Sequence, residues 1–456
     1  MGVEQRLIDG EFVDLKGAAI AASSIRELLI ADRLDPRGIR LRDARVEGVL
    51  DLADIQSKRP IVLLDCRTDN PVRLDRAALS SVDLSGLVAP AVSAAWLRLD
   101  HYLLLQKARL DGGEDDWALD LAEAHVGGHL SLRGAHLRGA RYALHAPRLR
   151  AGGEVFLTDL RADGAVRLDG ARIGGNLRCG GAVLRHDESP LLAVDLQVDQ
   201  NVFLDGGFQA TSTAPLHRTV RIRGSRIGGQ LVLKGRVTGP IALDLKHVRI
   251  GMEILLAPDF ADGQVSLDGL TYVGVPRDST LDDWLDLLAN RTLRYASQPY
   301  LQLAAAHQSA GNERDVRRIR VAQQRDLLRR GRLTRWGRLW HRVTGATVGY
   351  GYRPAIALLW LAATLTTAIL LVVVVAGPSG LTRATTGPCS TVEQIGLALN
   401  AATPLVKPDT QQRCQILTTT GLGQFVVITT WLLQALAWAF ATLFVAGFTG
   451  LVRKTT

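Results

Sequence analysis

The stretch "ARIGGNLRC" at residues 171–179 carries the pattern that decides the fold. Related stretches are "AHVGGHLSL" (124–132), "SRIGGQLVL" (225–233) and "ARVEGVLDL" (44–52). In each, a small residue turns inward, an Ile or Val packs, glycine permits a tight bend, and an apolar–any–apolar tripeptide follows. Units this short that recur along a chain indicate a repeat architecture rather than a sandwich or a Rossmann unit.

The tripeptides that end these units recur over more than half of the chain. They run from "IRL" ending at Leu41 to "VSL" ending at Leu267, and the commonest step between them is about eleven residues. Longer steps contain insertions such as "HDESP" and "ATSTAP". With two units per coil, this spacing predicts a mainly β protein, a β-solenoid of about ten coils with inward apolar ladders. We assign the solenoid to residues 39–275, after an N-terminal cap with a short helix at 1–38.

The low aromatic and high glycine content of the chain is consistent with a stack of thin repeated coils. Aromatic residues make up only 5% of the 456 residues, whereas 45 are glycine. Small and aliphatic side chains suit stacked coils better than one large round core. No G-x-G-x-x-G opens a helix in a βαβ unit, so corner glycines explain "GARIGG" better than a dinucleotide site does.

Four histidines are close together in the sequence, and they have two interpretations. A metal site needs three or four convergent ligands. Residues four and eleven apart fall on different sides of a coil, which favours solvent-exposed side chains instead. The histidines in question are His125, His129, His136 and His145.

The segment after the repeat predicts helices. Apolar residues recur at intervals of three and four from Leu281 to Leu333, and "SAGN" (309–312) divides them into a helical hairpin. Thr280 is the expected N-cap. Between Arg314 and Arg342 there are eleven arginines and two acids, which implies anionic lipid or nucleic acid nearby. Because a membrane follows directly, we favour lipid for this basic juxtamembrane segment, 279–346.

Two uncharged stretches, Ala355–Ala376 and Phe425–Val452, predict transmembrane helices. Each exceeds the length of about 20 apolar residues that spans a bilayer core, and the alternative is two buried helices of a soluble core. Four arginines precede the first stretch, and Arg453 and Lys454 follow the second. The loop between them, 377–424, holds only three basic residues. The positive-inside rule therefore predicts a two-span plasma-membrane protein with both termini in the cytoplasm.

The cysteines then fall into two compartments. Cys389 and Cys414 belong to the extracytoplasmic loop, where a disulfide between them is one hypothesis and two free thiols are the other. Cys66 and Cys179 are expected to stay reduced in the cytoplasm.

"TVGYGYRP" (347–354) contains the letters of a potassium-channel filter. A filter lies between two membrane helices, whereas this stretch precedes the first, so we interpret it as the segment where the chain enters the membrane. The predicted membrane-entry residues are Gly349, Tyr350, Gly351 and Pro354, and the predicted lipid-headgroup contacts are Arg335, Arg338 and Arg342.

The chain resembles a family of actinobacterial membrane proteins. The resemblance rests on "LDPRGIRLRDARVEGVLDLADI" (34–55), "QPYLQLAAAHQSAGNERDVRRI" (298–319), "VGYGYRP" (348–354), "FVAGFTGLVRK" (444–454) and the repeated "ARIGG" units. Members look like pentapeptide-repeat relatives, and some carry the label membrane-associated oxidoreductase. The chain also distantly resembles pentapeptide-repeat proteins fused to two-helix ion channels. Their pore loop is of the T-T-x-G-[YF]-G-D kind, and the matching stretch here, 390–409, lacks its glycine pair.

Three functions are compatible with the sequence. The leading one is a membrane-anchored cytoplasmic β-solenoid that acts as a binding or scaffolding module. The expected partners are the lipid bilayer, an unidentified protein on the solenoid, no nucleic acid, and further copies of the chain through the membrane helices. An oxidoreductase, as the resemblance implies, and a degenerate channel-like sensor are the alternatives. No cofactor motif occurs, and we predict no catalytic, cofactor-binding or metal-binding residue.

Overall fold

The computed structural model describes residues 2–31, 33–112, 116–351, 355–376, 381–383, 389–402, 414–416, 418–419 and 421–448. The chain divides into two compact units, Met1–Ile319 and Arg320–Thr456. Their boundary falls within helix α5 (Glu313–Arg330).

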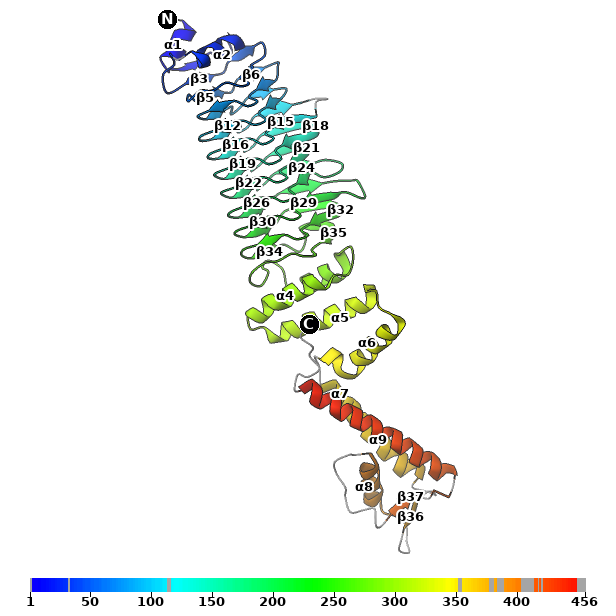
Figure 1. The fold of residues 1–456 in the computed structure, drawn as a ribbon. Coiled ribbons are helices and arrows are strands. Elements are labelled where there is room, and N and C mark those ends of the chain that lie inside the picture. The colour runs from blue at the N-terminus through cyan, green and yellow to red at the C-terminus, as the bar shows by residue number, and fades with distance from the viewer. Residues whose placement is uncertain are drawn as a thin grey trace. The chain divides into compact units, whose positions relative to one another are not determined.

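The first unit is a β-solenoid made of parallel strands, as Figure 1 shows. Each full coil has four sides, which we name face A, face B1, face B2 and face C in the order in which the chain visits them. Face A is an eleven-stranded ladder formed by β1 (Phe12–Asp14), β3 (Ile39–Arg42), β5 (Ile61–Leu64), β9 (Val82–Asp83), β13 (Leu103–Leu104), β17 (Leu130–Ser131), β20 (Val155–Phe156), β23 (Leu177–Arg178), β27 (Val202–Leu204), β31 (Leu231–Leu233) and β34 (Ile254–Leu256).

A folded sheet of sixteen strands covers the next two sides. Face B1 consists of β2 (Ala19–Ala21), β4 (Arg45–Glu47), β6 (Arg67–Thr68), β10 (Val88–Ala89), β14 (Arg109–Asp111), β24 (Val183–Arg185) and β28 (Gln209–Thr211). Face B2 consists of β7 (Val72–Arg73), β11 (Val92–Ser93), β15 (Trp117–Asp120), β25 (Leu191–Leu192) and β29 (Arg218–Arg221). Four longer strands run through both, namely β18 (His136–His145), β21 (Arg161–Arg167), β32 (Arg236–Asp244) and β35 (Ala261–Ser266).

Face C closes each coil with an eight-stranded ladder. Its strands are β8 (Ala78–Leu79), β12 (Arg98–Leu99), β16 (His125–Val126), β19 (Arg150–Ala151), β22 (Arg172–Ile173), β26 (Gln197–Val198), β30 (Arg226–Ile227) and β33 (Arg249–Ile250). Together these ladders confirm the predicted solenoid of about ten coils, in which stacked strands bury a continuous core.

The register gives the length of a coil. Ile39 pairs with Ile61 in the next coil, so one coil contains two of the eleven-residue units seen in the sequence. The longest coil runs from Val202 to its partner Leu231. Part of its extra length lies between Thr211 and Arg218, at the corner between faces B1 and B2.

Each side of a coil contributes two inward side chains, at positions i and i+2. In "ARIGGNLRC", Ala171 and Ile173 are buried under face C, and Leu177 and Cys179 are buried under face A. The eleven-residue unit is therefore two sides of a coil rather than one strand and a turn. Inward Leu, Ile, Val and Ala from successive coils stack into the core.

The glycines of this unit serve close packing rather than a left-handed backbone. A Cβ on Gly174 would lie 2.4 Å from the carbonyl oxygen of Gly152 in the preceding coil. The residues with positive φ stand at other corners and include non-glycine residues such as Lys107, at 55°. Gly174 and Gly175 form the bend that the sequence predicts, and glycine is required at Gly174 because the neighbouring backbone leaves no room for a side chain.

Helices cover both ends of the solenoid. Helix α1 (Val3–Ile8) and α2 (Ala22–Ile30) flank the first strands, β1 and β2, which already pair with β3 and β4. The first coil thus lies within the segment that the sequence assigned to a cap. At the other end, α3 (Leu281–Asp286), a π-helical turn η1 (Leu287–Arg291) and α4 (Ser297–Ser309) follow the last coil.

Helix α4 lies across the end of the ladders beyond β34 (Figure 1). Its glutamines bind the backbone that the last coil leaves without a neighbouring strand. Gly269 N–H donates to Gln298 Oε1 at 2.8 Å, and Gln298 Nε2 donates to the Leu270 carbonyl at 2.9 Å. Gln302 Nε2 donates to the Tyr272 carbonyl at 2.7 Å. These side chains make the hydrogen bonds that a further strand would otherwise make, and so they satisfy the backbone polar groups of the last coil.

The predicted helical hairpin is present with one more interruption than expected. Thr280 caps α3, as predicted, and it also forms a capping box with Asp283. The break at "SAGN" separates α4 from α5, which begins at Glu313. A second break at 292–296 separates η1 from α4 and was not predicted.

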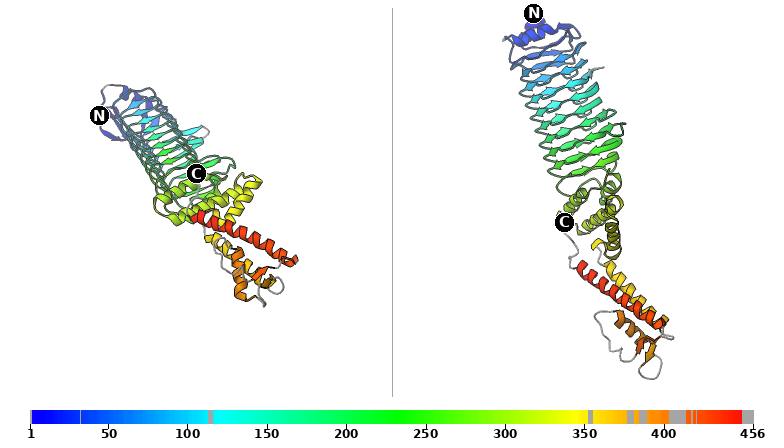
Figure 2. Two further views of the ribbon diagram at one scale, coloured as in Figure 1. Left: turned by 60° about the horizontal axis from the view of Figure 1, so that its bottom comes forward. Right: turned by 45° about the vertical axis from the view of Figure 1, so that its right-hand side comes forward.

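The second unit contains the two apolar helices. Its elements are α6 (Arg335–Val348), a short turn η2 (Gly349–Gly351), α7 (Ala355–Leu370), η3 (Leu371–Ala376), β36 (Leu381–Arg383), α8 (Thr391–Ala402), β37 (Cys414–Ile416) and α9 (Gly421–Phe448). Helices α7 and α9 lie side by side in Figures 1 and 2. Val372 of η3 packs against Leu397 and Ala398 of α8.

Two segments are long and apolar enough to cross a membrane, Ala355–Ala376 and Gly421–Ala446. The first has the predicted bounds. The second begins before the predicted Phe425, because Gly421 to Gln424 are already helical. The predicted end at Val452 lies outside the described residues.

Candidate functional site

A column of basic side chains runs along face C, and we call it the arginine ladder. Seven successive strands begin with an outward, exposed residue, and register places each beside the next. Neighbouring strands are about 4.7–4.9 Å apart, so the charges stack at that interval. The residues of the ladder are Arg98, His125, Arg150, Arg172, Gln197, Arg226 and Arg249.

None of the five arginines of the ladder forms an ion pair or a side-chain hydrogen bond within the described part of the chain. Face B2 differs. There Arg167 pairs with Asp169 at 2.7 Å, and Arg218 pairs with Asp244 at 2.9 Å. Like charges on adjacent strands destabilise a sheet, so a bound anion would relieve a cost that the arginines of face C carry.

The surface is flat beside five of the seven ladder residues, because a glycine follows each of those five, whereas Asp100 and Asp199 occupy the same position after Arg98 and Gln197. Gly127, Gly152, Gly174, Gly228 and Gly251 each come two residues after a ladder residue. A Cβ on any of them would lie 2.1–2.4 Å from a carbonyl oxygen of the preceding coil, so no side chain fits. The guanidinium groups are therefore open to a partner from this side.

Beyond the glycines, a polar column follows the corner between faces C and A. Asn201 Nδ2 donates to Asn176 Oδ1 at 2.9 Å, and the Gln230 N–H donates to Asn201 Oδ1 at 2.7 Å. Asn176 also donates to Glu154. Burial would raise the pKa of Glu154, but hydrogen bonds from Asn176 and Arg178 outweigh it and hold that pKa below its ordinary value. This column joins consecutive coils through side chains as well as backbone.

Face B1 carries a second basic surface, a groove of about 540 Å³. Arg109, His136 and Arg161 stack in one column of it. In the neighbouring column acids alternate with arginines, and Arg138 lies 3.8 Å from Asp111. Burial, with Arg161 and Arg109, lowers the pKa of His136. The groove is thus basic but partly neutralised, unlike the arginine ladder.

The four clustered histidines point in different directions. His125 belongs to the arginine ladder, His129 to the corner beside face A, and His136 to face B1. On face B2, His145 Nδ1 lies 2.9 Å from Asp120 Oδ1. Across the described ranges, no three His, Cys, Asp or Glu side chains come close enough to hold a metal ion.

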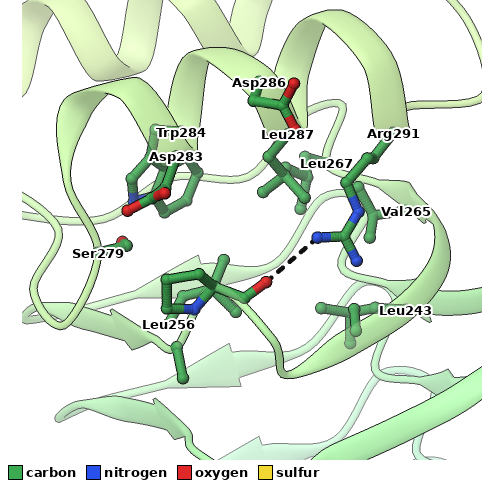
Figure 3. Close-up of a pocket in the computed structure, with 13 residues that line it drawn as sticks. Leu243, Leu256, Val265, Leu267, Ser279, Asp283, Trp284, Asp286, Leu287 and Arg291 are labelled. Atoms are coloured by element: carbon green, nitrogen blue, oxygen red, sulfur yellow. Dashed lines mark hydrogen bonds between the residues drawn. The ribbon is translucent and has the colours of Figure 1, made fainter.

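A small cavity of about 150 Å³ lies between the last coil and the helices α3 and η1 (Figure 3). Its walls are mainly apolar, and they include Leu256, Leu267 and Leu287. The Trp284 indole N–H and the Ser279 hydroxyl line it, and both are buried with no hydrogen-bond partner in the described part of the chain. The cavity is large enough for a molecule the size of benzene, and no feature of the sequence pointed to it.

The predicted membrane-entry residues lie at the end of α6 and just after it. Gly349 and Tyr350 both have positive φ, 55° and 60°, and they end the helix before Gly351. Trp360 Nε1 of α7 donates to the Ala346 carbonyl of α6 at 2.9 Å. Pro354 lies outside the described residues.

Helix α6 also carries an apolar stripe that the sequence analysis missed. Trp336, Leu339, Trp340 and Val343 are spaced as one helix face, and Trp336 is 82% exposed. The predicted headgroup residues Arg335, Arg338 and Arg342 belong to the same helix and share its spacing of three and four. The signal was the i, i+3, i+4, i+7 pattern of the apolar residues.

The cysteines form one disulfide and two buried thiols. Cys389 and Cys414 are joined, with an S–S distance of 2.10 Å, and the bond links the segment before α8 to β37. Cys66 and Cys179 are free and buried inside the solenoid. Burial raises their pKa to about 11 and about 12, respectively.

Comparison of the chain with family models, with curated proteins and with solved structures finds no match. A function has to be inferred from the surfaces of this chain.

Proposed function

We propose that this protein is a membrane-anchored β-solenoid scaffold whose arginine ladder binds a protein partner rich in acidic side chains. The observation that carries the proposal is the set of five arginines on face C that have no ion-pair partner among the residues the structure describes. Arginine forks bind carboxylates with two parallel hydrogen bonds, and a rigid scaffold fixes the spacing of those forks.

The surroundings of the ladder favour an acidic protein over nucleic acid. Single-stranded nucleic acid is bound by aromatic side chains that stack on bases, and no aromatic ring other than His125 belongs to the ladder. Asp100 and Asp199 are exposed two residues after Arg98 and Gln197, where they would repel a continuous row of phosphates. A protein presents separate carboxylates among neutral and basic groups, and it therefore fits this mixed surface better.

Anchoring is assigned to the second unit. In the proposal, Ala355–Ala376 and Gly421–Ala446 cross the bilayer, with both chain termini in the cytoplasm. Helix α6 lies in the cytoplasmic interface with Trp336 and Trp340 toward the acyl chains. Its arginines contribute about 1 kcal/mol each near an anionic surface. In this proposal the first unit binds the partner and the second unit anchors the protein in the membrane.

The test uses the full-length protein in lipid nanodiscs and a fluorescent octaglutamate peptide as the probe. Arg150→Glu with Arg172→Glu reverses two central charges of the ladder. We expect peptide affinity to fall roughly tenfold, because two exposed contacts of up to about 1 kcal/mol each turn from attraction to repulsion. Higher salt should weaken binding by the wild type more than binding by the variant.

The matched control reverses Arg138→Glu and Arg185→Glu on face B1, the side opposite the ladder in each coil. Peptide affinity should change less than threefold, roughly 0.6 kcal/mol. A larger loss in the control than in the ladder variant would move the site to face B1. Tighter binding of a single-stranded oligonucleotide, lost in the same ladder variant, would overturn the assignment to an acidic protein.

A further inference from the structure

Helix α9 has two neighbouring stripes of residues, of which the first is buried by packing within the chain and the second is partly buried or exposed. Val426, Thr430, Ala437 and Phe440 are buried, and the Phe440 ring stacks on Trp360 of α7 with centroids 6.0 Å apart. These four residues follow a heptad spacing, as expected where two helices pack at a small angle.

The second stripe also follows a heptad spacing, displaced by one residue. Its members are Val427, Trp431, Gln434, Trp438 and Ala441, at alternating intervals of four and three. Trp431 is 66% exposed and Trp438 is 47% exposed. Gln434 is partly exposed and lies at the middle of the 28-residue helix. A polar side chain therefore sits at the depth where the bilayer is most apolar.

Gln434 differs from the hydroxyl side chains of α9 in its hydrogen bonding. The hydroxyls of Thr429, Thr430 and Thr442 each donate to a carbonyl one turn earlier, at 2.8–2.9 Å. The Gln434 amide has no hydrogen-bond partner among the described residues. Two N–H donors and a carbonyl acceptor are thus unpaired, and acyl chains offer no partner for them.

We propose that two copies of this chain associate in the membrane through the second stripe of α9, with their Gln434 amides hydrogen-bonded to each other. A carboxamide is both donor and acceptor, so it complements its own copy. Copies inserted with the same orientation place Gln434 at the same depth, as a two-fold axis along the membrane normal requires. Hydrogen bonds of this kind stabilise helix association in lipid. The inference rests on the proposed membrane-spanning role of α7 and α9.

The test measures energy transfer between full-length copies labelled at the amino terminus and reconstituted together in vesicles over a range of lipid-to-protein ratios. Gln434→Leu should raise the dissociation constant of the pair roughly threefold to thirtyfold. Gln434→Asn should recover part of the association. The control is Gln424→Leu, near the start of α9, whose amide already donates to the Thr418 carbonyl at 3.3 Å. It should leave energy transfer unchanged.

Cysteine cross-linking tests which side of α9 meets the second copy. Ala441→Cys lies on the second stripe and should form a disulfide between copies, whereas exposed Ala435→Cys lies off the stripe and should not. Unchanged association of Gln434→Leu, or equal cross-linking at both positions, would overturn the proposal. Wild-type protein that is carbonate-resistant but gives no energy transfer refutes this inference alone. Wild-type protein that carbonate extracts refutes the proposed anchoring as well.

Discussion

At the scale of single residues, several corners of the solenoid require a positive φ, which is unfavourable for a residue with a side chain. Lys107 turns the corner between faces A and B1 with φ at 55°, and its side chain is exposed. This conformation costs an L-residue about 1–2 kcal/mol, and it costs a β-branched residue more. Substitutions at Lys107 therefore change the conformational cost of the corner without changing core packing.

Lys107→Val should destabilise this corner, whereas Lys107→Gly should not. We expect the amides of Arg109 and Leu110, which follow the corner, to exchange hydrogen roughly tenfold faster in the valine variant, because local opening reflects about 1–2 kcal/mol of added strain. Hydrogen exchange of the intact protein in micelles is the measurement. Equal protection in the two variants would mean that the corner stores no strain.

The thiols of Cys66 and Cys179 should be unreactive in the folded protein. Burial raises their pKa to about 11 and about 12, so both stay protonated at about pH 8 in addition to being inaccessible. Without reductant, iodoacetamide should label no cysteine of the native protein and two after unfolding in guanidinium. Reduction of the Cys389–Cys414 bond should add two more. Four labelled cysteines in unfolded, unreduced protein would contradict the disulfide.

Asn201 connects three coils at the corner between faces C and A. Asn201→Ala removes the acceptor of the Gln230 N–H and the donor to Asn176, and unpaired polar groups cost about 1–3 kcal/mol. We expect faster exchange of the Gln230 amide and a lower Tm. Asn201→Asp is the control because it keeps the acceptor, so the Gln230 amide should stay protected in that variant.

The inward residues were readable from the sequence, whereas the arginine ladder was not. Apolar side chains at alternate positions mark Ile173 and Leu177 as core without any knowledge of neighbours. The ladder depends on which residues of different coils stack, and the length of a coil varies along the solenoid because of insertions at its corners. Only the register shows that Arg172 lies beside Arg150.

At the scale of elements, helix α4 is the cap that ends the solenoid. The double variant Gln298→Ala, Gln302→Ala leaves the backbone of Gly269, Leu270 and Tyr272 without its side-chain partners. We expect a lower Tm and loss of protection at the Gly269 amide, because each buried unpaired group costs about 1–3 kcal/mol.

Gln308→Ala is the matched control for that variant, because Gln308 is exposed on the same helix. Its Tm should equal that of the wild type. A similar loss in both variants would show that helix propensity, rather than the bonds to the last coil, stabilises this end.

The sequence predicted correctly which segments are helices, but it predicted fewer of the breaks between them. The spacing of apolar residues at three and four predicted helix over 281–333, and Thr280 and "SAGN" gave two of the boundaries. The break at 292–296 itself contains no glycine or proline, although Pro299 in the first turn of α4 marks where the next helix begins. It occurs where the chain leaves η1 and turns to lay α4 on the last coil, so tertiary packing overrides local propensity there.

At the scale of the whole molecule, topology is the property that the proposed function needs most. If both termini are cytoplasmic, trypsin outside right-side-out vesicles should cut only in the loop 377–424, at Arg383 or Arg413, because Pro408 blocks cleavage after Lys407. The solenoid should then survive as a protected fragment. Inverted vesicles provide the control, since there the solenoid side is exposed and the loop is protected. Cleavage of the solenoid from outside would reverse the proposed orientation.

The sequence alone predicted a solenoid followed by a part with two apolar helices, because both predictions depend on local patterns of residues. The solenoid period and the two long uncharged stretches are properties of neighbouring residues. The self-association proposed for Gln434 does not follow from the sequence. It requires knowing which side of α9 is already covered by α7.

The uneven coil length also makes this molecule useful as a display support. Between Thr211 and Arg218 the chain leaves the ladders and returns in register, and Leu216 there is 81% exposed. Loop length costs little free energy once the ends of the loop are fixed. A foreign epitope spliced next to Leu216 should therefore be presented to an antibody while the strands above and below keep their pairing.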